Sequence, residues 1–146
     1  MKVISENRRA RFDYSISETY DAGIELKGFE VKSAKSGRLN ISGSYGLARH
    51  GEVWLINSQI PPYQPKNTPL NYDPGRPRRL LMRKEEIETL AGQLHGGRLS
   101  LVPLRAYLKN SIIKIELGLG RPRKKSDKRE IMKERAAKRE IKKVLG

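Results

Sequence analysis

The sequence contains no cysteine, only two histidines, and few aromatic residues: two Phe, one Trp and six Tyr in 146 residues. Without cysteine, a disulfide framework and a cysteine-ligated zinc site are both excluded. No apolar run reaches the length of about 18 residues that a membrane-spanning helix needs. The N-terminal segment Met1–Phe12 also lacks the apolar core of a signal peptide. We therefore expect a protein that acts in the cytoplasm and has no membrane partner.

A catalytic site is also missing from the pattern. His50 and His95 lie far apart in the sequence, and both fall at expected turns or helix ends. Nothing matches a zinc-protease helix, a phosphate-binding loop, a nucleophile elbow or a paired-carboxylate metal site. A metal-dependent nuclease clusters its acidic ligands, whereas the acidic residues here are scattered among Lys and Arg. We expect no enzymatic activity, no metal site and no cofactor.

Positive charge is abundant and unevenly distributed. The chain carries 31 Lys and Arg against 16 Asp and Glu, a net charge of +15 with a pI near 10.3. The last 26 residues, from Arg121 onward, hold 12 of the basic and 4 of the acidic residues. Such an excess indicates a polyanionic partner, and its concentration at one end is typical of chains that bind nucleic acid.

The body of the chain has the alternation of short β-strands. We expect strands over 11–16, 39–47, 51–60, 80–82, 99–108 and 112–119. The range 20–35 is ambiguous between a continued strand and a helical turn near its end, and the proline-rich range 61–77 is expected to be an irregular loop. Only 83–94 has the spacing of an amphipathic helix. The fold class is therefore mainly β: a small, closed or partly open β-barrel of the oligonucleotide-binding (OB) type with flanking helices.

Residues 1–120 are expected to form the barrel, and residues 121–146 a basic C-terminal tail. The tail has helix-forming composition, with Asp127 as its expected N-cap, but its apolar positions are too sparse to bury a stripe. We expect it to be disordered when free and helical when bound to a polyanion. A basic amphipathic helix can also lie on a membrane, but the apolar positions here include no Trp or Phe.

Three basic segments lie near aromatic residues: 7–11, 76–79 and the tail from Arg121. A single run of charge is usually a solvated face. Three runs beside Phe12, Tyr14, Tyr63 and Tyr72 instead favour RNA, which is bound through phosphates, 2′-hydroxyls and stacked unpaired bases.

Several ordered blocks resemble the SsrA-binding protein family, and together they span essentially the whole chain. They are Asn7–Arg11, Tyr14, Glu18–Ile24, Gly28–Ser33, Ser36, Gly37, Asn40, Ile60, Pro62, Tyr63, Asn71, Asp73, Pro74, Arg76, Arg78–Leu81, Leu101–Tyr107 and Asp127–Arg129. The resemblance implies an OB-type barrel that binds the tRNA-like domain of transfer-messenger RNA, one copy per RNA, and carries it to stalled ribosomes. It also implies that the tail enters the decoding centre and mRNA channel, so that the nascent peptide is tagged and the ribosome is released in trans-translation. The partners are then transfer-messenger RNA and the ribosomal RNA of both subunits.

Positions are carried over by the same resemblance. Contacts with the tRNA-like domain are implied for Glu30, Val31, Lys32, Ser33, Asn40, Tyr45, Arg78 and Arg79. Contacts of the tail with the ribosome are implied for Arg123, Lys124, Lys125, Asp127, Lys128, Arg129 and Lys133. The chain departs from the family pattern at Gly43, where many relatives carry an acid, and around Ser126, where one of the preceding residues is often His or aromatic.

Alternatives remain open at several positions. Glu30 could accept hydrogen bonds from RNA bases, or it could be the structural partner of Lys32 or a nearby arginine. Asn40 could simply satisfy a turn, and Tyr14, Tyr20 and Tyr107 suit the core better than an RNA surface. At the level of function, a general ribosome-associated RNA-binding protein is the alternative to the adaptor, and a nuclease is disfavoured by the scattered acids.

Overall fold

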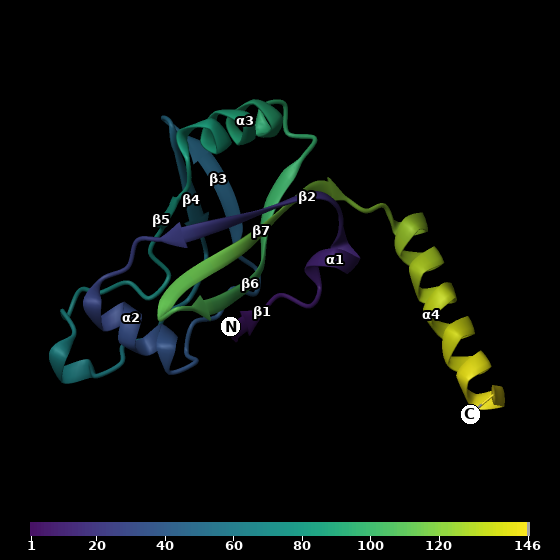
Figure 1. The fold of residues 1–146 in the computed structure, drawn as a ribbon, viewed down its shortest axis with the longest axis horizontal. Helices are drawn as coiled ribbons and strands as arrows, with labels where there is room; N and C mark the ends of the chain where they lie inside the picture. The colour runs from purple at the N-terminus through teal and green to yellow at the C-terminus, as the bar shows by residue number, and fades with distance from the viewer. Residues whose placement is uncertain (146) are drawn as a thin grey trace.

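The computed structural model describes residues 1–145 and shows a β-barrel with helices around it and one long C-terminal helix that projects away from it (Figure 1). The strands are β1 (Lys2–Glu6), β2 (Tyr14–Ile24), β3 (Tyr45–Arg49), β4 (Glu52–Ile56), β5 (Arg78–Leu81), β6 (Ser100–Lys109) and β7 (Ile112–Pro122). The helices are α1 (Ala10–Asp13), α2 (Gly28–Lys35), α3 (Lys84–Leu94) and α4 (Lys125–Leu145), with a short 3-10 turn η1 at Pro65–Asn67.

Antiparallel pairing closes the sheet on itself. The strand order is β1-β6-β3-β4-β5-β2-β7, and β7 pairs back onto β6. The seam between β3 and β6 is the narrowest part of the ring, since its register contains only the pair Gly46 and Leu101. A Cβ at Gly46 would stand 2.5 Å from the Leu101 side chain, so glycine is what lets the two strands meet. The prediction of a mainly β, OB-type barrel with flanking helices is confirmed.

The barrel interior is filled by the inward-facing residues of the strands. The fully buried ones include Ala22, Val53, Leu55, Leu80, Ile115 and Leu117. Outside the strands, α3 buries Leu90 against this core, with Ile87 and Leu94 packed beside it, as its amphipathic spacing predicts. One continuous apolar cluster therefore holds the strands and α3 together.

Two predicted strands begin in the wrong place. Residues 10–13 form α1 instead of the start of a strand, because the backbone N–H groups of Phe12 and Asp13 both donate to the Arg9 carbonyl, at 3.0 and 2.8 Å. The strand expected over 39–47 begins only at Tyr45. Before it the chain turns at Gly43, whose φ of +75° breaks the extended conformation.

Two further boundaries differ. The strand expected to reach residue 60 ends at Ile56. Strand β1 was not expected at all, because Lys2–Glu6 is largely exposed and shows no alternation of its own. Its conformation comes from antiparallel pairing with β6, from the pair Lys2 and Leu108 to the pair Glu6 and Arg105. An edge strand of this kind is specified by its partner rather than by its own pattern.

The tail is a helix without a bound partner, which differs from the predicted disorder. No residue of α4 is buried. Its helical conformation has a local origin: Lys125–Leu145 is rich in Lys, Arg, Glu and Ala, and the Asp127 carboxylate accepts a hydrogen bond from the Lys124 backbone N–H at 3.1 Å. Asp127 thus caps the helix from the third helical position, not from the N-cap where it was expected.

Candidate RNA-binding surfaces

Glu30 lies at the centre of a buried ionic cluster between α2 and the loop 61–77. Its Oε1 accepts hydrogen bonds from the Lys27 backbone N–H at 2.8 Å and from the Arg76 guanidinium. Its Oε2 accepts from Arg76 Nε at 3.1 Å and from Arg78 Nε and Nη2 at 3.0 and 2.7 Å. The α2 N-terminus creates this position, because an acid at the third helical residue reaches back to the N-cap amide.

Arg78 completes the cluster from β5. Its guanidinium donates to the Ser58 carbonyl and hydroxyl, both at 3.1 Å, to the Pro74 carbonyl at 2.9 Å and to the Tyr72 hydroxyl at 3.0 Å. The Tyr72 hydroxyl lies 3.0 Å from Glu30 Oε2 and 2.7 Å from the Ile60 carbonyl oxygen. A buried charge is tolerated only with partners of this number and geometry, and these partners tie the irregular loop to the barrel.

Two opposing effects set the pKa of Glu30. Burial raises it, but hydrogen bonds from Arg76, the Lys27 amide and Arg78 outweigh burial and bring the pKa to about 2. At Tyr72, burial and the adjacent Glu30 carboxylate raise the pKa of the hydroxyl to about 12. At neutral pH the cluster therefore holds one ionised carboxylate, two guanidinium groups and a neutral phenol.

This cluster corrects the roles predicted for Glu30, Ser33 and Arg78. All three residues are 0% exposed. The Ser33 hydroxyl donates to the Pro61 carbonyl at 2.6 Å, so it also holds the start of the loop. Direct contact of these side chains with RNA is therefore wrong for this structure, and the alternative of Glu30 as partner of a nearby arginine is confirmed.

The alternation within β5 could have revealed the burial of Arg78. Arg78 pairs with Leu55 and Leu80 pairs with Val53, so both residues of β5 face the interior, while Arg79 between them pairs with Trp54 on the outside. Since strand side chains alternate between faces, a buried Leu80 places Arg78 inward. Reading 76–79 as one basic run hid that alternation.

The other four predicted RNA contacts are more accessible. Lys32 is exposed on α2, and Arg79 is exposed on β5 with its Nε 3.8 Å from Glu52 Oε1. Val31 is half-buried and packs against the core cluster. Asn40 is exposed, but its Oδ1 accepts a hydrogen bond from the Ser42 backbone N–H at 2.9 Å, so the alternative of an Asn that satisfies a turn is confirmed.

Tyr45 belongs to an exposed outer face of β3, β4 and β5. Leu47, Trp54 and Arg79 are successive cross-strand neighbours on this face. Tyr45 and Leu47 remain 43% and 41% exposed, which is unusual for large apolar side chains of a soluble barrel. Aromatic and arginine side chains side by side on a sheet form a surface on which unpaired bases stack.

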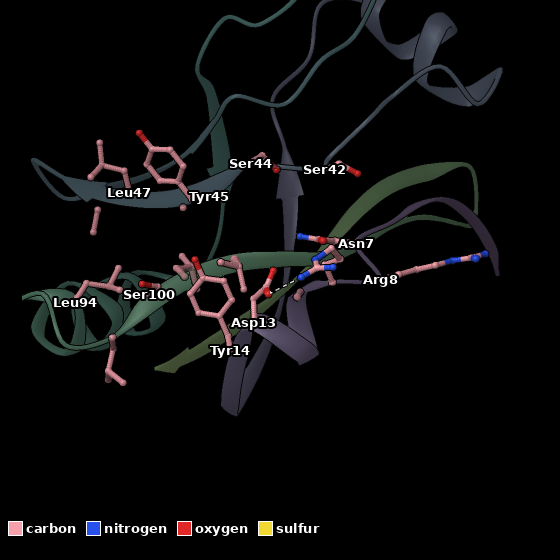
Figure 2. Close-up of a pocket in the computed structure, with 18 of the residues that line it drawn as sticks. Asn7, Arg8, Asp13, Tyr14, Ser42, Ser44, Tyr45, Leu47, Leu94 and Ser100 are labelled. Atoms are coloured by element: carbon pink, nitrogen blue, oxygen red, sulfur yellow. Dashed lines mark hydrogen bonds and ion pairs between the residues drawn. The ribbon is translucent and has the colours of Figure 1, made fainter. Parts of the chain in front are cut away.

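A cleft of about 980 Å³ opens at the narrow seam beside this face. In Figure 2, Tyr45 and Leu47 from β3 lie on one wall, and Tyr14 from β2 lies on the wall opposite, with Asn7 and Arg8 at one end. Tyr14 also packs against the small cluster formed by Ala10, Val102 and Leu104. It was expected in the core, and the structure gives it both a packed side and a side that faces the cleft.

The seven predicted tail residues lie at the barrel end of α4 and in the segment before it. Six of them fall outside the barrel strands in the first turns of the helix or close to it, and α4 itself begins at Lys125. The exposed ones are Lys124, Lys125, Asp127, Arg129 and Lys133. Arg123 and Lys128 are half-buried, because both contact α1.

Nothing in residues 1–145 brings catalytic groups together. His50 and His95 are both exposed, one in the turn between β3 and β4 and the other at the end of α3. Across that range there is no group of three or more His, Asp or Glu side chains placed to hold a metal ion. Nor does any helix of that range combine the length and apolar character needed to cross a membrane.

Comparison with known proteins agrees with this architecture. The family described as SmpB protein matches residues 4–146. The SsrA-binding protein of Carboxydothermus hydrogenoformans is 51% identical over 99% of this chain and 96% of its own length. That of Synechocystis sp. is 49% identical over 99% of this chain and 94% of its own.

A solved structure is also similar. It is a chain from "tmRNA-SmpB: a journey to the center of the bacterial ribosome", with a TM-score of 0.66 and 44% identity, and the match covers 86% of this chain and 91% of that one. The agreement in sequence extends over the barrel and α4 alike, as the family match to residues 4–146 shows. The chain belongs to the SmpB family of SsrA-binding proteins.

Proposed function

We propose that this protein is the RNA-binding adaptor of trans-translation. It binds the tRNA-like domain of transfer-messenger RNA and delivers it to stalled ribosomes, where its tail occupies the decoding centre and mRNA channel. The observation that carries the proposal is family membership over the whole chain together with a net charge of +15. It acts as one copy per RNA in the cytoplasm, contacts both ribosomal subunits, and catalyses no reaction.

The two parts of the chain divide this work. Residues 1–120 form the unit that recognises the tRNA-like domain, and residues 121–146 form the unit that contacts the ribosome. The change in burial supports this boundary, since β7 is buried through Gly120 whereas α4 buries no side chain. The charge supports it as well, because the last 26 residues carry 12 Lys and Arg.

On the barrel, RNA contacts fall to the accessible residues of the predicted set. Lys32 and Arg79 supply phosphate contacts, and Tyr45 supplies a stacking surface beside the cleft. Val31 and Asn40 contribute mainly by shaping the backbone around them. Glu30, Ser33 and Arg78 act indirectly, because their buried network fixes the loop 61–77 next to the exposed Lys32 and Arg79.

On the tail, the basic residues contact ribosomal RNA phosphates, while Asp127 holds the helix start. The proposed contacts are Arg123, Lys124, Lys125, Lys128, Arg129 and Lys133. Neutralising several phosphates releases counterions, so affinity for the ribosome falls steeply as salt rises.

A competition assay at physiological salt tests the proposal directly. Labelled tRNA-like domain of transfer-messenger RNA is bound to the full chain and challenged with unlabelled tRNA-like domain, elongator tRNA or a ribosomal RNA fragment. Displacement by the tRNA-like domain alone supports the adaptor. Equal displacement by all three would replace it with a general ribosome-associated RNA-binding protein.

A further inference from the structure

The start of the tail is attached to α1, a segment more than a hundred residues away in the chain. Lys128 Nζ lies 3.2 Å from Asp13 Oδ1, and the same oxygen accepts a hydrogen bond from Arg9 Nη2 at 3.3 Å. The backbone is attached as well: the Arg123 N–H donates to the Asp13 carbonyl at 2.8 Å, and Arg123 Nε donates to the Arg11 carbonyl at 3.3 Å. The segment that leaves β7 is therefore held on both sides of Pro122.

Phe12 extends this attachment along the helix. Its ring centroid lies 5.8 Å from Lys128 Nζ and 5.4 Å from the Arg135 guanidinium carbon, and 5.2 Å from that of Arg9 on its own segment. Lys128 and Arg135 are two helical turns apart, so both lie on the same face of α4. A ring that contacts two successive turns constrains the direction of the helix axis, not only the position of its first residue.

No other group of the described chain has this role. Within residues 1–145, every salt bridge and cation–π contact between α4 and the rest of the protein involves Asp13 or Phe12. Beyond Arg135 all the side chains of α4 are exposed, and the helix runs away from the barrel (Figure 1). The direction of a helix of 21 residues therefore depends on two side chains of a four-residue helix.

Charge supports the permanence of this contact. Burial raises the pKa of Asp13, but hydrogen bonds and attraction from Arg9 and Lys128 outweigh burial and lower it overall. Asp13 is therefore ionised at every pH at which the protein functions. It is also the only carboxylate among three cations that surround the Phe12 ring.

We infer that α1 is a docking platform that sets the direction in which the tail leaves the barrel, with Phe12 and Asp13 as positioning residues. The inference rests on the proposed adaptor function, because a directed tail matters only if it must reach a site beside the bound RNA. A pre-oriented tail loses less conformational freedom on binding than one that hangs from a flexible linker. The barrel would then present RNA and tail in one fixed relation.

Distances between spin labels test the docking without any RNA. The chain has no native cysteine, so labels can be placed at Lys109→Cys on the exposed β6–β7 turn and Lys138→Cys on α4. We expect a narrow distance distribution in the otherwise unchanged protein and a broad one in Lys128→Asp, which changes only the tail and leaves the barrel intact. Adding Asp13→Lys to Lys128→Asp reverses the pair and is expected to narrow the distribution again.

Two further variants complete the design. Phe12→Leu keeps an apolar side chain but removes the ring, and we expect it to broaden the distribution. Glu88→Lys makes the same charge change as Asp13→Lys on an exposed position of α3, and we expect no effect. Equal widths in all variants would overturn the docking platform.

Peptide tagging on stalled ribosomes distinguishes positioning from direct contact. We expect Lys128→Asp to lower tagging about threefold, the size of effect that one partly exposed ion pair supports, and the reversed pair to restore it. If Lys128 acted by touching ribosomal RNA, the reversed pair would stay defective, and the inference would fail. Binding to the tRNA-like domain is measured beside it: loss of that binding in the unchanged protein would refute the adaptor function while leaving the distance result intact.

Discussion

The barrel and the tail carry positive charge in opposite ways. In the barrel, Arg78 is fully buried and its donors are used by Glu30 and by backbone carbonyls, so the charge organises the protein itself. In α4 no side chain is buried, and most cations have no acidic partner within the protein. A basic residue therefore indicates a polyanion only when its environment leaves it accessible, and the same residue type inside the barrel is a structural element.

Deleting the tail is the strongest test of this contrast. Removal of Asp127–Gly146 takes away exposed cations but no buried side chain, so we expect the barrel to fold with an unchanged melting temperature. Affinity for the tRNA-like domain is expected to stay within about threefold, because few phosphate contacts are lost there. Tagging on stalled ribosomes is expected to be abolished. A large loss of affinity for the tRNA-like domain would show that barrel and tail do not divide the work.

Adjacent arginines sharpen the comparison within the barrel. Arg78→Ala leaves the buried Glu30 carboxylate without its main partner, and we expect it to lower the free energy of unfolding by about 3–5 kcal/mol. Arg79→Ala, one residue along, removes an exposed side chain and is expected to cost under about 1 kcal/mol. RNA affinity at permissive temperature is expected to show the reverse order. Urea denaturation and RNA binding on both variants provide the measurements, and equal destabilisation would contradict the assignment.

Acid denaturation isolates the Glu30 carboxylate. Its pKa in the folded protein is about 2, against an ordinary value of 4.5. A lowered pKa contributes stability that is fully present above the ordinary value and is lost as the pH falls toward the folded value. Between pH 6 and pH 2 we therefore expect the unchanged protein to lose on the order of 3 kcal/mol more than Glu30→Gln does. Parallel pH profiles for the two proteins would show that another group accounts for the acid sensitivity.

The sequence predicted the barrel well because most of its strands alternate and its one good amphipathic helix has clear spacing. The hairpin between β6 and β7 and helix α3 lie close to the predicted ranges. It failed where conformation is set by partners: β1 takes its register from β6, and α1 forms because two amides reach the Arg9 carbonyl. Alternation of Phe12 with Tyr14 could not distinguish a strand from a single helical turn followed by one.

The candidate surface was predicted less completely, for a related reason. Composition identifies basic and aromatic residues but not whether they are accessible. Tyr72 looked like a stacking residue and is instead a member of the Glu30 cluster, packed edge-on against Phe29 at a centroid distance of 4.8 Å. Tyr14 looked like a core residue and in fact also lines the cleft. Only the path of the loop 61–77 decides such cases, and an irregular loop leaves no periodic signal.

The smallest effect concerns the helicity of the free tail. Three like-charged pairs at i,i+4 spacing, Arg135–Arg139, Lys138–Lys142 and Arg139–Lys143, oppose the helix, and tertiary contact reaches only its first turns. Since isolated helices of this length are marginal, we expect partial helicity in the difference between the circular dichroism spectra of the full chain and of a chain ending at Lys124. Added RNA, or salt that screens the repulsion, is expected to raise that signal modestly. A difference spectrum that is fully helical in low salt would mean that the contacts at Phe12 and Asp13 stabilise the whole of α4, and that the tail reaches the ribosome already folded.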